Sequence, residues 1–274
     1  MPELPEVETL RRTLARRLPG RQVRRVDVIR PGQIRHPAPD AFRSALTGRT
    51  FGEPGRRGKY LLLPLDGDRT LVCHLRMSGR LYVVSPEVPR ARHTHVVLGL
   101  DDGTELRYED QRTFGGFHLV GPGDEGAPAG LRTLGPEPLD PDWGPEQLAA
   151  ELKGRRAAVK AVLLDQRAVA GLGNIYADEA LFRAGIHPAR PAGALGGAEV
   201  ERLHRAVREV LDNAIARRGT TFSLYLDGEA RPGDFYSELR VYDREGEPCP
   251  RCGRPIAKIR VAGRGTHLCP RCQA

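Results

Sequence analysis

The chain has 274 residues, a length that suits one large domain or two ordinary ones. Lys and Arg number 43 against 35 Asp and Glu, and the resulting net charge of +8 favours a polyanionic partner. Most of the positive charge is arginine, which suits phosphates and base edges, although genome composition or thermal adaptation would enrich arginine as well. No apolar run reaches the roughly 20 residues of a membrane span, and no leader-like segment opens the chain, so we expect a soluble intracellular protein.

The first predicted element is an amphipathic helix near the amino terminus. Apolar residues recur there at intervals of three or four from Leu4 to Leu18, with arginines on the other faces, and Gly20 follows. This helix would fix the amino terminus against a core. Residues 23–120 then carry short apolar or alternating runs between Asp-Gly and Pro-Gly turns, which indicates a β-sandwich or barrel.

The second half of the chain is predicted to be mainly helical. Residues 121–145 are rich in Gly, Pro and Asp and have the character of a linker. Helical periodicity then marks four segments, which are 146–152, 155–164, 175–184 and 198–217. Residues 219–235 lack periodicity and predict an irregular loop. The fold class that follows is α+β in two domains, with a β-sandwich and flanking helices first and a helical domain second.

The opening residues Met1-Pro2-Glu3-Leu4-Pro5-Glu6 carry a possible nucleophile. Removal of Met1 leaves a secondary amine, and an α-amino group has a pKa of about 7.7–8.0 against about 10.4 for lysine. Attack of this amine on a sugar carbon gives an iminium, an electron sink for elimination at the neighbouring carbon. Glu3 and Glu6 are placed for proton transfer. Two plainer explanations exist, since Met-Pro starts often reflect processing only, and Glu6 and Glu8 would complement a helix dipole.

Four cysteines near the carboxyl end have the spacing of a metal site. Cys249 and Cys252 form one Cys-x-x-Cys pair, and Cys269 and Cys272 form a second pair sixteen residues later. Four thiolates fill a tetrahedral zinc site, which makes the predicted Zn²⁺ structural and the intervening residues a β-hairpin. A pair of disulfides is the alternative, and an intracellular chain disfavours it. The fifth cysteine, Cys73, is expected to be a buried thiol in a strand.

Three long motifs resemble the formamidopyrimidine-DNA glycosylase family of bacterial base-excision enzymes. They are Pro2–Thr9, Gly171–Glu179 and the four-cysteine ribbon, and the resemblance covers essentially the whole chain. It implies a bifunctional DNA glycosylase and apurinic/apyrimidinic (AP) lyase that removes 8-oxoguanine and formamidopyrimidines from duplex DNA by β,δ-elimination. It also implies one Zn²⁺, double-stranded DNA with oxidised bases or abasic sites as partner, and a monomer in the bacterial cytoplasm, on nucleoid DNA.

The resemblance assigns roles to individual residues. Pro2 would be the nucleophile, Glu3 the general acid and base, and Glu6 would assist. Lys59 belongs to the same catalytic group and would hold a phosphate of the DNA. The remaining DNA contacts would be His74, Met77, Arg112, Phe114, Asn174 and Arg264. Asn174 lies in the family's helix-two-turn-helix element. The lesion pocket would be formed by Thr220, Phe222, Ser223, Leu224 and Tyr225.

The plain alternatives for these residues follow from composition alone. Lys59 would be a surface lysine and His74 a core histidine, while Met77 and Phe114 would pack in the core and Arg112 would form a surface ion pair. Two rival functions also remain open. One is an endonuclease VIII-like glycosylase for oxidised pyrimidines, and the other is a non-catalytic protein that binds damaged DNA.

The predicted domains are a catalytic β-sandwich over 1–130 and a linker over 131–145. A helix-two-turn-helix domain follows over 146–237, including the lesion-recognition loop 219–235. A four-cysteine zinc finger over 238–274 ends the chain.

Overall fold

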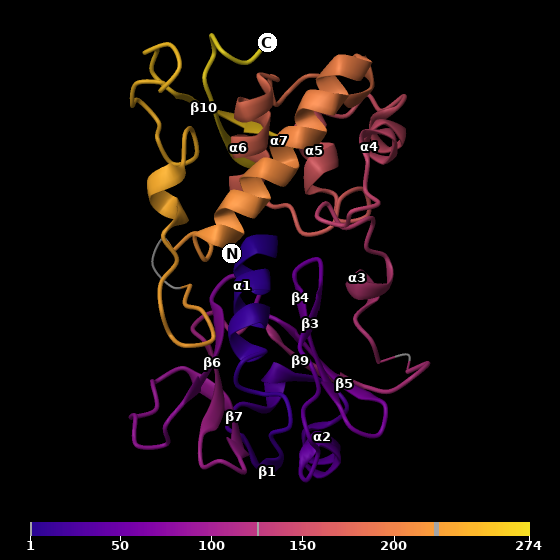
Figure 1. The fold of residues 1–274 in the computed structure, drawn as a ribbon, viewed down its shortest axis with the longest axis vertical. Helices are drawn as coiled ribbons and strands as arrows, with labels where there is room; N and C mark the ends of the chain where they lie inside the picture. The colour runs from indigo at the N-terminus through magenta and orange to yellow at the C-terminus, as the bar shows by residue number, and fades with distance from the viewer. Residues whose placement is uncertain (1, 125, 222–224) are drawn as a thin grey trace. The chain divides into compact units, whose positions relative to one another are not determined.

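Residues 23–120 form two β-sheets in the computed structural model, which describes residues 2–124, 126–221 and 225–274 (Figure 1). An antiparallel sheet has the strand order β1 (Val23–Val28), β7 (Thr94–Leu100), β8 (Glu105–Asp110), β6 (Gly79–Val84). A mixed sheet has the order β2 (Ile34–His36), β9 (Gly116–Val120), β5 (Arg69–His74), β4 (Tyr60–Leu65), β3 (Gly55–Arg57). In this second sheet β2 runs parallel to β9 and the other neighbours are antiparallel.

The two sheets share one apolar core, which confirms the predicted sandwich. Tyr108 of β8 meets Phe117 of β9 edge to face, with ring centroids 4.9 Å apart, so the contact joins one sheet to the other. Cys73 of β5 is fully buried in this core, as predicted.

Helix α1 (Leu4–Leu14) covers part of this core and contacts β3, β4 and β6. It ends at Leu14, earlier than the apolar period suggested, but Leu18 stays buried in the core beyond the helix end. The short helix α2 (Pro39–Leu46) was not predicted. Pro39 stands in its first turn, where a missing N–H costs nothing, and Phe42 and Leu46 reach the core.

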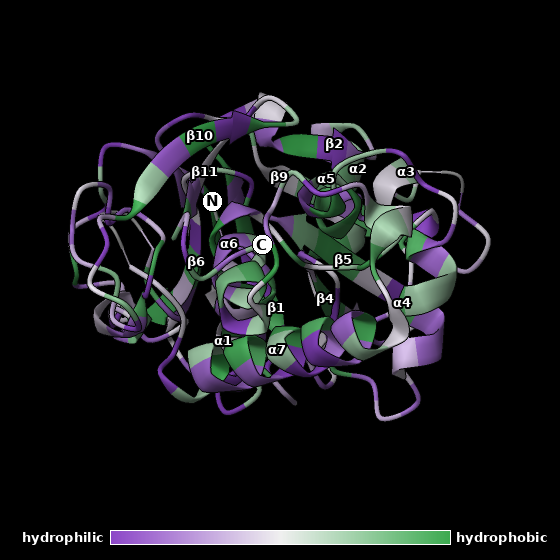
Figure 2. Ribbon diagram, turned by 90° about the horizontal axis from the view of Figure 1, so that it is seen from above, coloured by the Kyte–Doolittle hydropathy of each residue, from purple (hydrophilic) through white to green (hydrophobic). Residues whose placement is uncertain are grey.

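The predicted helical region is present. Its helices are α4 (Pro145–Leu152), α5 (Val159–Leu164), α6 (Asn174–Ala184) and α7 (Gly197–Ala216), preceded by the short α3 (Ala129–Arg132) within the expected linker. Apolar residues follow one side of α7 and polar residues the other (Figure 2), and the apolar side is buried. Strands β10 (Ala257–Val261) and β11 (Arg264–Leu268) form the hairpin expected between the cysteine pairs. Short 3₁₀ turns complete the elements at η1 (Pro31–Gln33), η2 (Ala192–Ala194) and η3 (Phe235–Glu238).

The described residues divide into two compact units. The first comprises Met1–Arg132 and Arg217–Asp234, and the second comprises Thr133–Ala216 and Phe235–Ala274. The sequence grouped 219–235 with the helices, whereas the structure groups Arg217–Asp234 with the sandwich. The reason is hydrogen bonding to α1 and β6, which Gly228 provides through its N–H to Thr13 and its carbonyl to Val83. No helix within the described ranges is long and apolar enough to cross a membrane.

Candidate functional site

The amino end of α1 holds two buried carboxylates in fixed positions. Glu3 is the N-cap and Glu6 stands three residues later, so the two form a capping box. The Glu3 backbone N–H donates to Glu6 Oε2 at 2.7 Å. Pro2 is buried beside them. Capping and proton transfer are therefore compatible roles for Glu6, because the capping bond itself positions its carboxylate next to the chain start.

Glu6 also connects the chain start to the segment that follows α7. Its other oxygen, Oε1, accepts a hydrogen bond from the Thr220 N–H at 2.8 Å. Gly219 has φ +80°, and a Cβ there would lie 2.8 Å from Glu6 Oε1, so glycine is required for this approach. The Tyr225 hydroxyl donates to the Glu6 carbonyl at 3.1 Å. Thr220 and Tyr225, two of the residues predicted for a lesion pocket, thus both contact Glu6, while Phe222, Ser223 and Leu224 fall outside the described residues.

Burial first, and the nearby Glu6 charge second, raise the pKa of Tyr225 well above its ordinary value. The phenol therefore keeps its proton at neutral pH. It remains a hydrogen-bond donor to the helix that carries Glu6.

A second part of the first unit places a histidine and a lysine close together. Lys59 is buried in the turn between β3 and β4, and His74 ends β5, opposite Tyr60. The Arg76 N–H donates to His74 Nδ1 at 3.0 Å, so the proton of the neutral ring is on Nε2. Burial, together with the charges of Arg76 and Lys59, lowers the pKa of His74 to about 3. His74 is therefore a neutral N–H donor at neutral pH.

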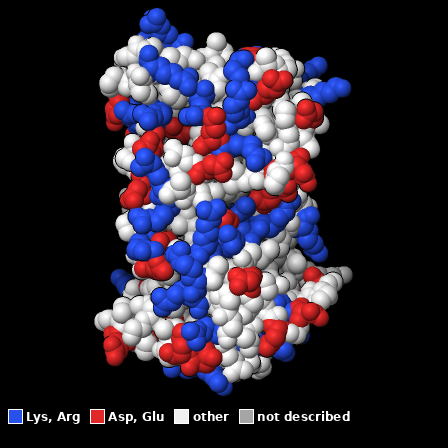
Figure 3. All heavy atoms as spheres, viewed as in Figure 1, with Lys and Arg blue, Asp and Glu red and all other residues white. Residues whose placement is uncertain are grey.

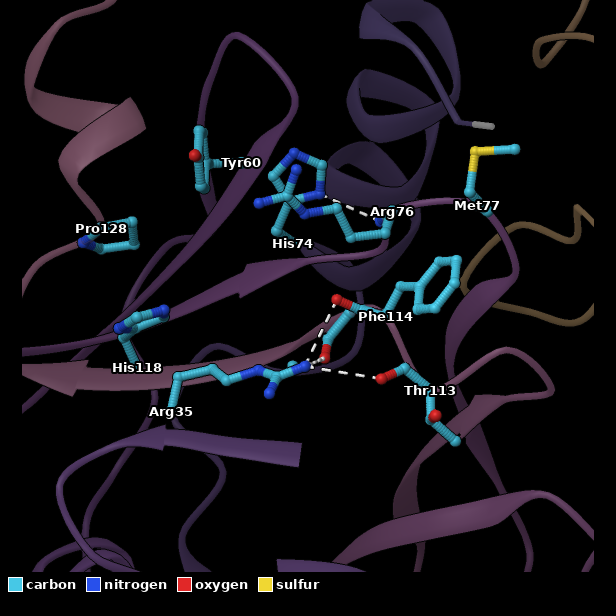
Figure 4. A pocket seen from close by; sticks show the side chains of 11 residues that line it. Arg35, Tyr60, His74, Arg76, Met77, Thr113, Phe114, His118 and Pro128 are labelled. Carbon is cyan, nitrogen blue, oxygen red and sulfur yellow. Dashed lines mark hydrogen bonds between the residues drawn. The ribbon is translucent and has the colours of Figure 1, made fainter. Parts of the chain in front are cut away.

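Met77 and Phe114 are exposed, contrary to the plain expectation that they pack in the core. Their exposed fractions are 41% and 52%, and they project from neighbouring loops at the rim of a cavity of about 590 Å³ (Figure 4). The Arg112 guanidinium lies over the Phe114 ring, 4.8 Å from its centroid. Arg112 is thus in a cation–π pair, where the plain alternative was an ion pair.

The loop that carries Arg112 and Phe114 is held from within by Asp110, which sequence reasoning missed. Asp110 is fully buried, and its Oδ1 accepts from the Ser78 hydroxyl at 2.5 Å and from the Arg112 N–H at 3.2 Å. Its Oδ2 accepts from the Gly115 N–H at 2.8 Å and from the Tyr108 hydroxyl at 3.2 Å. An acid two residues before an arginine was the only sequence signal, and it does not specify these partners.

Arg35 closes the same loop from outside. Its guanidinium donates to the carbonyls of Thr113, Phe114 and Gly115 at 3.1–3.4 Å (Figure 4). Thr113 has φ +57°, a conformation that a β-branched residue adopts only when its surroundings enforce it. The exposed side chains of this loop therefore stand on a rigid base.

In the second unit, the start of α6 contacts the tip of the β10–β11 hairpin. Asn174 is the first residue of α6, and its Nδ2 donates to the Gly265 carbonyl at 2.9 Å, next to exposed Arg264. Lys160 of α5 donates to the same carbonyl at 3.1 Å and pairs with Asp178 of α6 at 2.6 Å. The two predicted DNA contacts Asn174 and Arg264 are therefore neighbours in space.

The Lys160–Asp178 pair was not predicted as part of the site. Both side chains are buried, and Asp178 also accepts the His267 N–H of β11 at 2.9 Å. Asp178 lies inside the Gly171–Glu179 motif, which was the available signal, whereas nothing in the sequence marks Lys160 as its partner.

The four cysteines converge as the spacing predicted. Their sulfur atoms all lie within 4.8 Å of one another, and Cys249 and Cys269 are buried. Four thiolates at this separation match the tetrahedral donor set that zinc prefers. The Arg251 N–H donates to Cys249 Sγ at 3.4 Å, a contact that stabilises a thiolate. The donor set therefore fits a structural Zn²⁺.

The face drawn in Figure 3 carries many Lys and Arg side chains, with Asp and Glu side chains between them. This basic charge, the exposed Met77, Phe114 and Arg112, and the zinc ribbon beside Arg264 are typical of one class of protein, the DNA-binding proteins. The comparisons with known proteins make the class specific.

Three family models match the chain in order. They are the formamidopyrimidine-DNA glycosylase N-terminal domain over residues 1–117, the formamidopyrimidine-DNA glycosylase H2TH domain over residues 134–225, and the zinc finger found in FPG and IleRS over residues 246–274. The formamidopyrimidine-DNA glycosylase of Symbiobacterium thermophilum is 65% identical over 273 residues, covering 100% of this chain and 89% of that protein.

Solved structures agree over the same length. A Lactococcus lactis Fpg in complex with abasic-site DNA has a TM-score of 0.92 at 38% identity, covering 99% of each chain. The MutM (FPG) protein of Thermus thermophilus has a TM-score of 0.89 at 44% identity, covering 99% of this chain and 98% of that one. The chain belongs to the formamidopyrimidine-DNA glycosylase family. It is a DNA glycosylase and AP lyase of base excision repair, and its ribbon holds one structural Zn²⁺.

Proposed function

We propose that Pro2, after removal of Met1, is the nucleophile that attacks C1′ of the damaged nucleotide. The observation that carries this proposal is the buried capping box, in which Glu3 and Glu6 stand beside the chain start. An amine with a pKa near 8 needs only nearby proton carriers to act at neutral pH. The carboxylates of Glu3 and Glu6 supply them.

The reaction balances without an external oxidant. A bond forms from the Pro2 nitrogen to C1′, the glycosidic bond breaks, and the damaged base leaves with a proton. The C1′–O4′ bond then breaks, O4′ takes a proton from Glu3, and the nitrogen lone pair forms the iminium. The iminium makes the C2′ protons acidic, so β-elimination and then δ-elimination release the phosphates on both sides. Glu3 acts as the acid and base toward the opened sugar, and Glu6 holds the ring nitrogen in place.

We assign the phosphate contacts to Lys59 and His74 in the first unit and to Asn174 and Arg264 in the second. Because the pKa of His74 is about 3, this residue donates a hydrogen bond through Nε2 and brings no charge. Lys59 and Arg264 bring the charge and release counterions. Binding should therefore weaken steeply with salt.

Met77, Arg112 and Phe114 are assigned to the space that a flipped nucleotide leaves in the duplex. Two exposed apolar side chains on rigid loops can stack between base steps, and an arginine can hydrogen-bond to the base left without a partner. Thr220 and Tyr225, with Phe222, Ser223 and Leu224, are assigned to the lesion pocket.

The preferred substrates in this proposal are 8-oxoguanine opposite cytosine and ring-opened formamidopyrimidines. The Lactococcus lactis relative has been solved with an N7-benzyl-Fapy-dG containing DNA, which supports purine-derived lesions. The same relative has also been solved with an oxidised pyrimidine containing DNA, and this observation keeps oxidised pyrimidines as a second candidate substrate. Comparing excision from 8-oxoguanine and thymine-glycol duplexes ranks the two classes. We place the enzyme, as a monomer, in the bacterial cytoplasm on nucleoid DNA.

The decisive experiment is borohydride trapping on 8-oxoguanine and abasic duplexes. Borohydride reduces the iminium, so a covalent protein–DNA adduct should form, and peptide mass spectrometry should locate the bond at Pro2. The Pro2→Gly variant should trap far less. Pro39→Gly, the same substitution in the first turn of α2, is the matched control and should trap normally. Active protein that still carries its initiator methionine would contradict the proposal.

A further inference from the structure

The segment that follows α7 is attached to α1 at two points seven residues apart. Glu6 binds the Thr220 N–H at 2.8 Å, and Thr13 Oγ1 accepts the Gly228 N–H at 2.9 Å. Seven residues are about two helical turns, or roughly 10 Å, so both attachment points lie on the same face of the helix. The described residues 225–229 are thus aligned along the helix that carries Glu3.

The second attachment point is tightly constrained. A Cβ on Gly228 would lie 2.5 Å from Thr13 Oγ1 and 3.1 Å from the Leu14 side chain, so the Gly228 backbone is seated directly on α1. On its other side, the Gly228 carbonyl accepts from the Val83 N–H of β6 at 3.0 Å. The backbone at Gly228 is therefore held between α1 and the sheet.

Next to Gly228, buried Asp227 closes a turn. Its Oδ1 accepts from the Glu229 and Arg231 N–H groups, both at 2.9 Å, and its backbone N–H donates to the Arg231 carbonyl at 2.8 Å. Tyr225 stands two residues before this turn, and its carbonyl accepts from the Thr221 hydroxyl at 3.1 Å, so the seat of Gly228 on α1 bears on Tyr225 and on its contact with Thr221. Among the described residues of α1, it is the Thr13 side chain that accepts the hydrogen bond from the Gly228 N–H.

We propose that Thr13 is a positioning residue that sets the place of the described residues 225–229 on α1, and so determines selectivity for a damaged base over an abasic site. The proposal rests on the assignment of Thr220 and Tyr225 to the lesion pocket. Thr13 lies about 10 Å along the helix from Glu6, too far to touch the reacting sugar. Its hydroxyl is therefore needed to hold the segment that reads the base and has no part in the chemistry at C1′.

The test compares two substrates in single-turnover assays of Thr13→Val. Valine keeps the shape and β-branching of threonine but removes the acceptor for the Gly228 N–H. Excision of 8-oxoguanine should slow by roughly two- to tenfold, the range for one lost hydrogen bond. Incision of an abasic duplex should stay within about twofold of wild type, since an abasic site has no base to read. That retained activity also shows that the variant folds.

Two further variants make the outcome specific. Thr13→Ser keeps the hydroxyl oxygen and should restore excision. The Thr13 hydroxyl also donates within its own helix, to the Thr9 and Leu10 carbonyls at 3.1 and 2.9 Å. Thr47→Val is the matched control, because it removes an exposed hydroxyl at the end of α2 that donates to the Arg43 carbonyl at 2.9 Å, and it should leave both rates unchanged. An equal fall in both Thr13→Val rates, or no fall in either, overturns the proposal. Failure of the Pro2 assignment would instead appear as the loss of borohydride adducts in the wild type.

Discussion

Replacing Asp110 by asparagine should weaken the loop that carries Arg112 and Phe114. The carboxylate accepts from two backbone N–H groups, one at each oxygen, and from two hydroxyls. An asparagine side chain places an NH₂ group at one of these positions. The hydroxyls of Ser78 and Tyr108 can rotate, but a backbone N–H cannot. The Arg112 N–H also donates to the Ser78 hydroxyl at 3.0 Å, so the NH₂ group is best placed toward Arg112, and the Asp110–Arg112 hydrogen bond is lost while Gly115 keeps its acceptor.

The expected size follows from that lost bond. A hydrogen bond to a charged group contributes about 1.5–3 kcal/mol to the free energy of unfolding. For a chain of this size that is a fall of roughly 2–10 °C in Tm. Urea denaturation measures the free energy, and a fluorescent base analogue opposite the lesion reports whether the side chains still insert. We expect weaker insertion together with the loss of stability.

Asp102→Asn is the matched control. Asp102 also caps a loop of the sandwich, accepting from the Thr104 N–H and hydroxyl and pairing with Arg21 at 3.2 Å, but it is exposed and precedes β8, whereas the Arg112 loop follows β8. Its replacement should cost less than about 1 kcal/mol and leave insertion unchanged. If Asp110→Asn matches wild type in both measurements, or if Asp102→Asn loses as much, the reasoning about the buried carboxylate is refuted.

Three other predictions follow from buried groups. Removing Zn²⁺ with a strong chelator should unfold the β10–β11 hairpin and abolish tight DNA binding while the sandwich still melts cooperatively, as circular dichroism and binding assays would show. Because the pKa of His74 is about 3 when folded and about 6.5 when unfolded, its contribution to stability is present above pH 6.5 and is lost as the pH falls toward 3. Urea denaturation of His74→Gln should therefore show a shallower loss of stability than wild type between pH 7 and pH 4, by up to about 1.4 kcal/mol per pH unit. Lys160→Met should leave the buried Asp178 carboxylate without its ion-pair partner and lower the free energy of unfolding by about 3–5 kcal/mol. An unchanged urea midpoint would contradict this.

Most of the architecture could be predicted from local patterns, because these elements are specified by residues close together in the sequence. The apolar period from Leu4 onward marks α1, the short alternating runs mark the sandwich, and the paired cysteines mark the ribbon. Helix α2 was not predicted because it has only eight residues, and because Pro37, just before it, and Pro39, at its first position, favour a turn when read alone. The sequence did not predict that residues 217–234 belong with the sandwich, because this depends on hydrogen bonds to α1, more than two hundred positions earlier in the chain.

The candidate site was predictable only where a motif carried it. Composition alone places Met77 and Phe114 in the core, since apolar side chains are usually buried there. They are exposed because their loops leave the strands through left-handed residues, Arg76 at φ +53° and Thr113 at φ +57°. Left-handed backbone conformations of this kind depend on tertiary contacts such as those of Asp110, and no local sequence pattern encodes such contacts.

Helix α1 joins the chemistry of this enzyme to its recognition of the base. Its apolar face, including Leu10 and Leu14, is buried in the sandwich core, so the helix cannot slide or rotate without loss of that packing. Its polar face is therefore fixed, and Glu6 and Thr13 present hydrogen-bond acceptors at set positions for the segment after α7. In the proposed mechanism, the residues that read the base are placed by the same helix that places Glu3. We therefore expect selectivity to change through Thr13 while the geometry around C1′ stays intact.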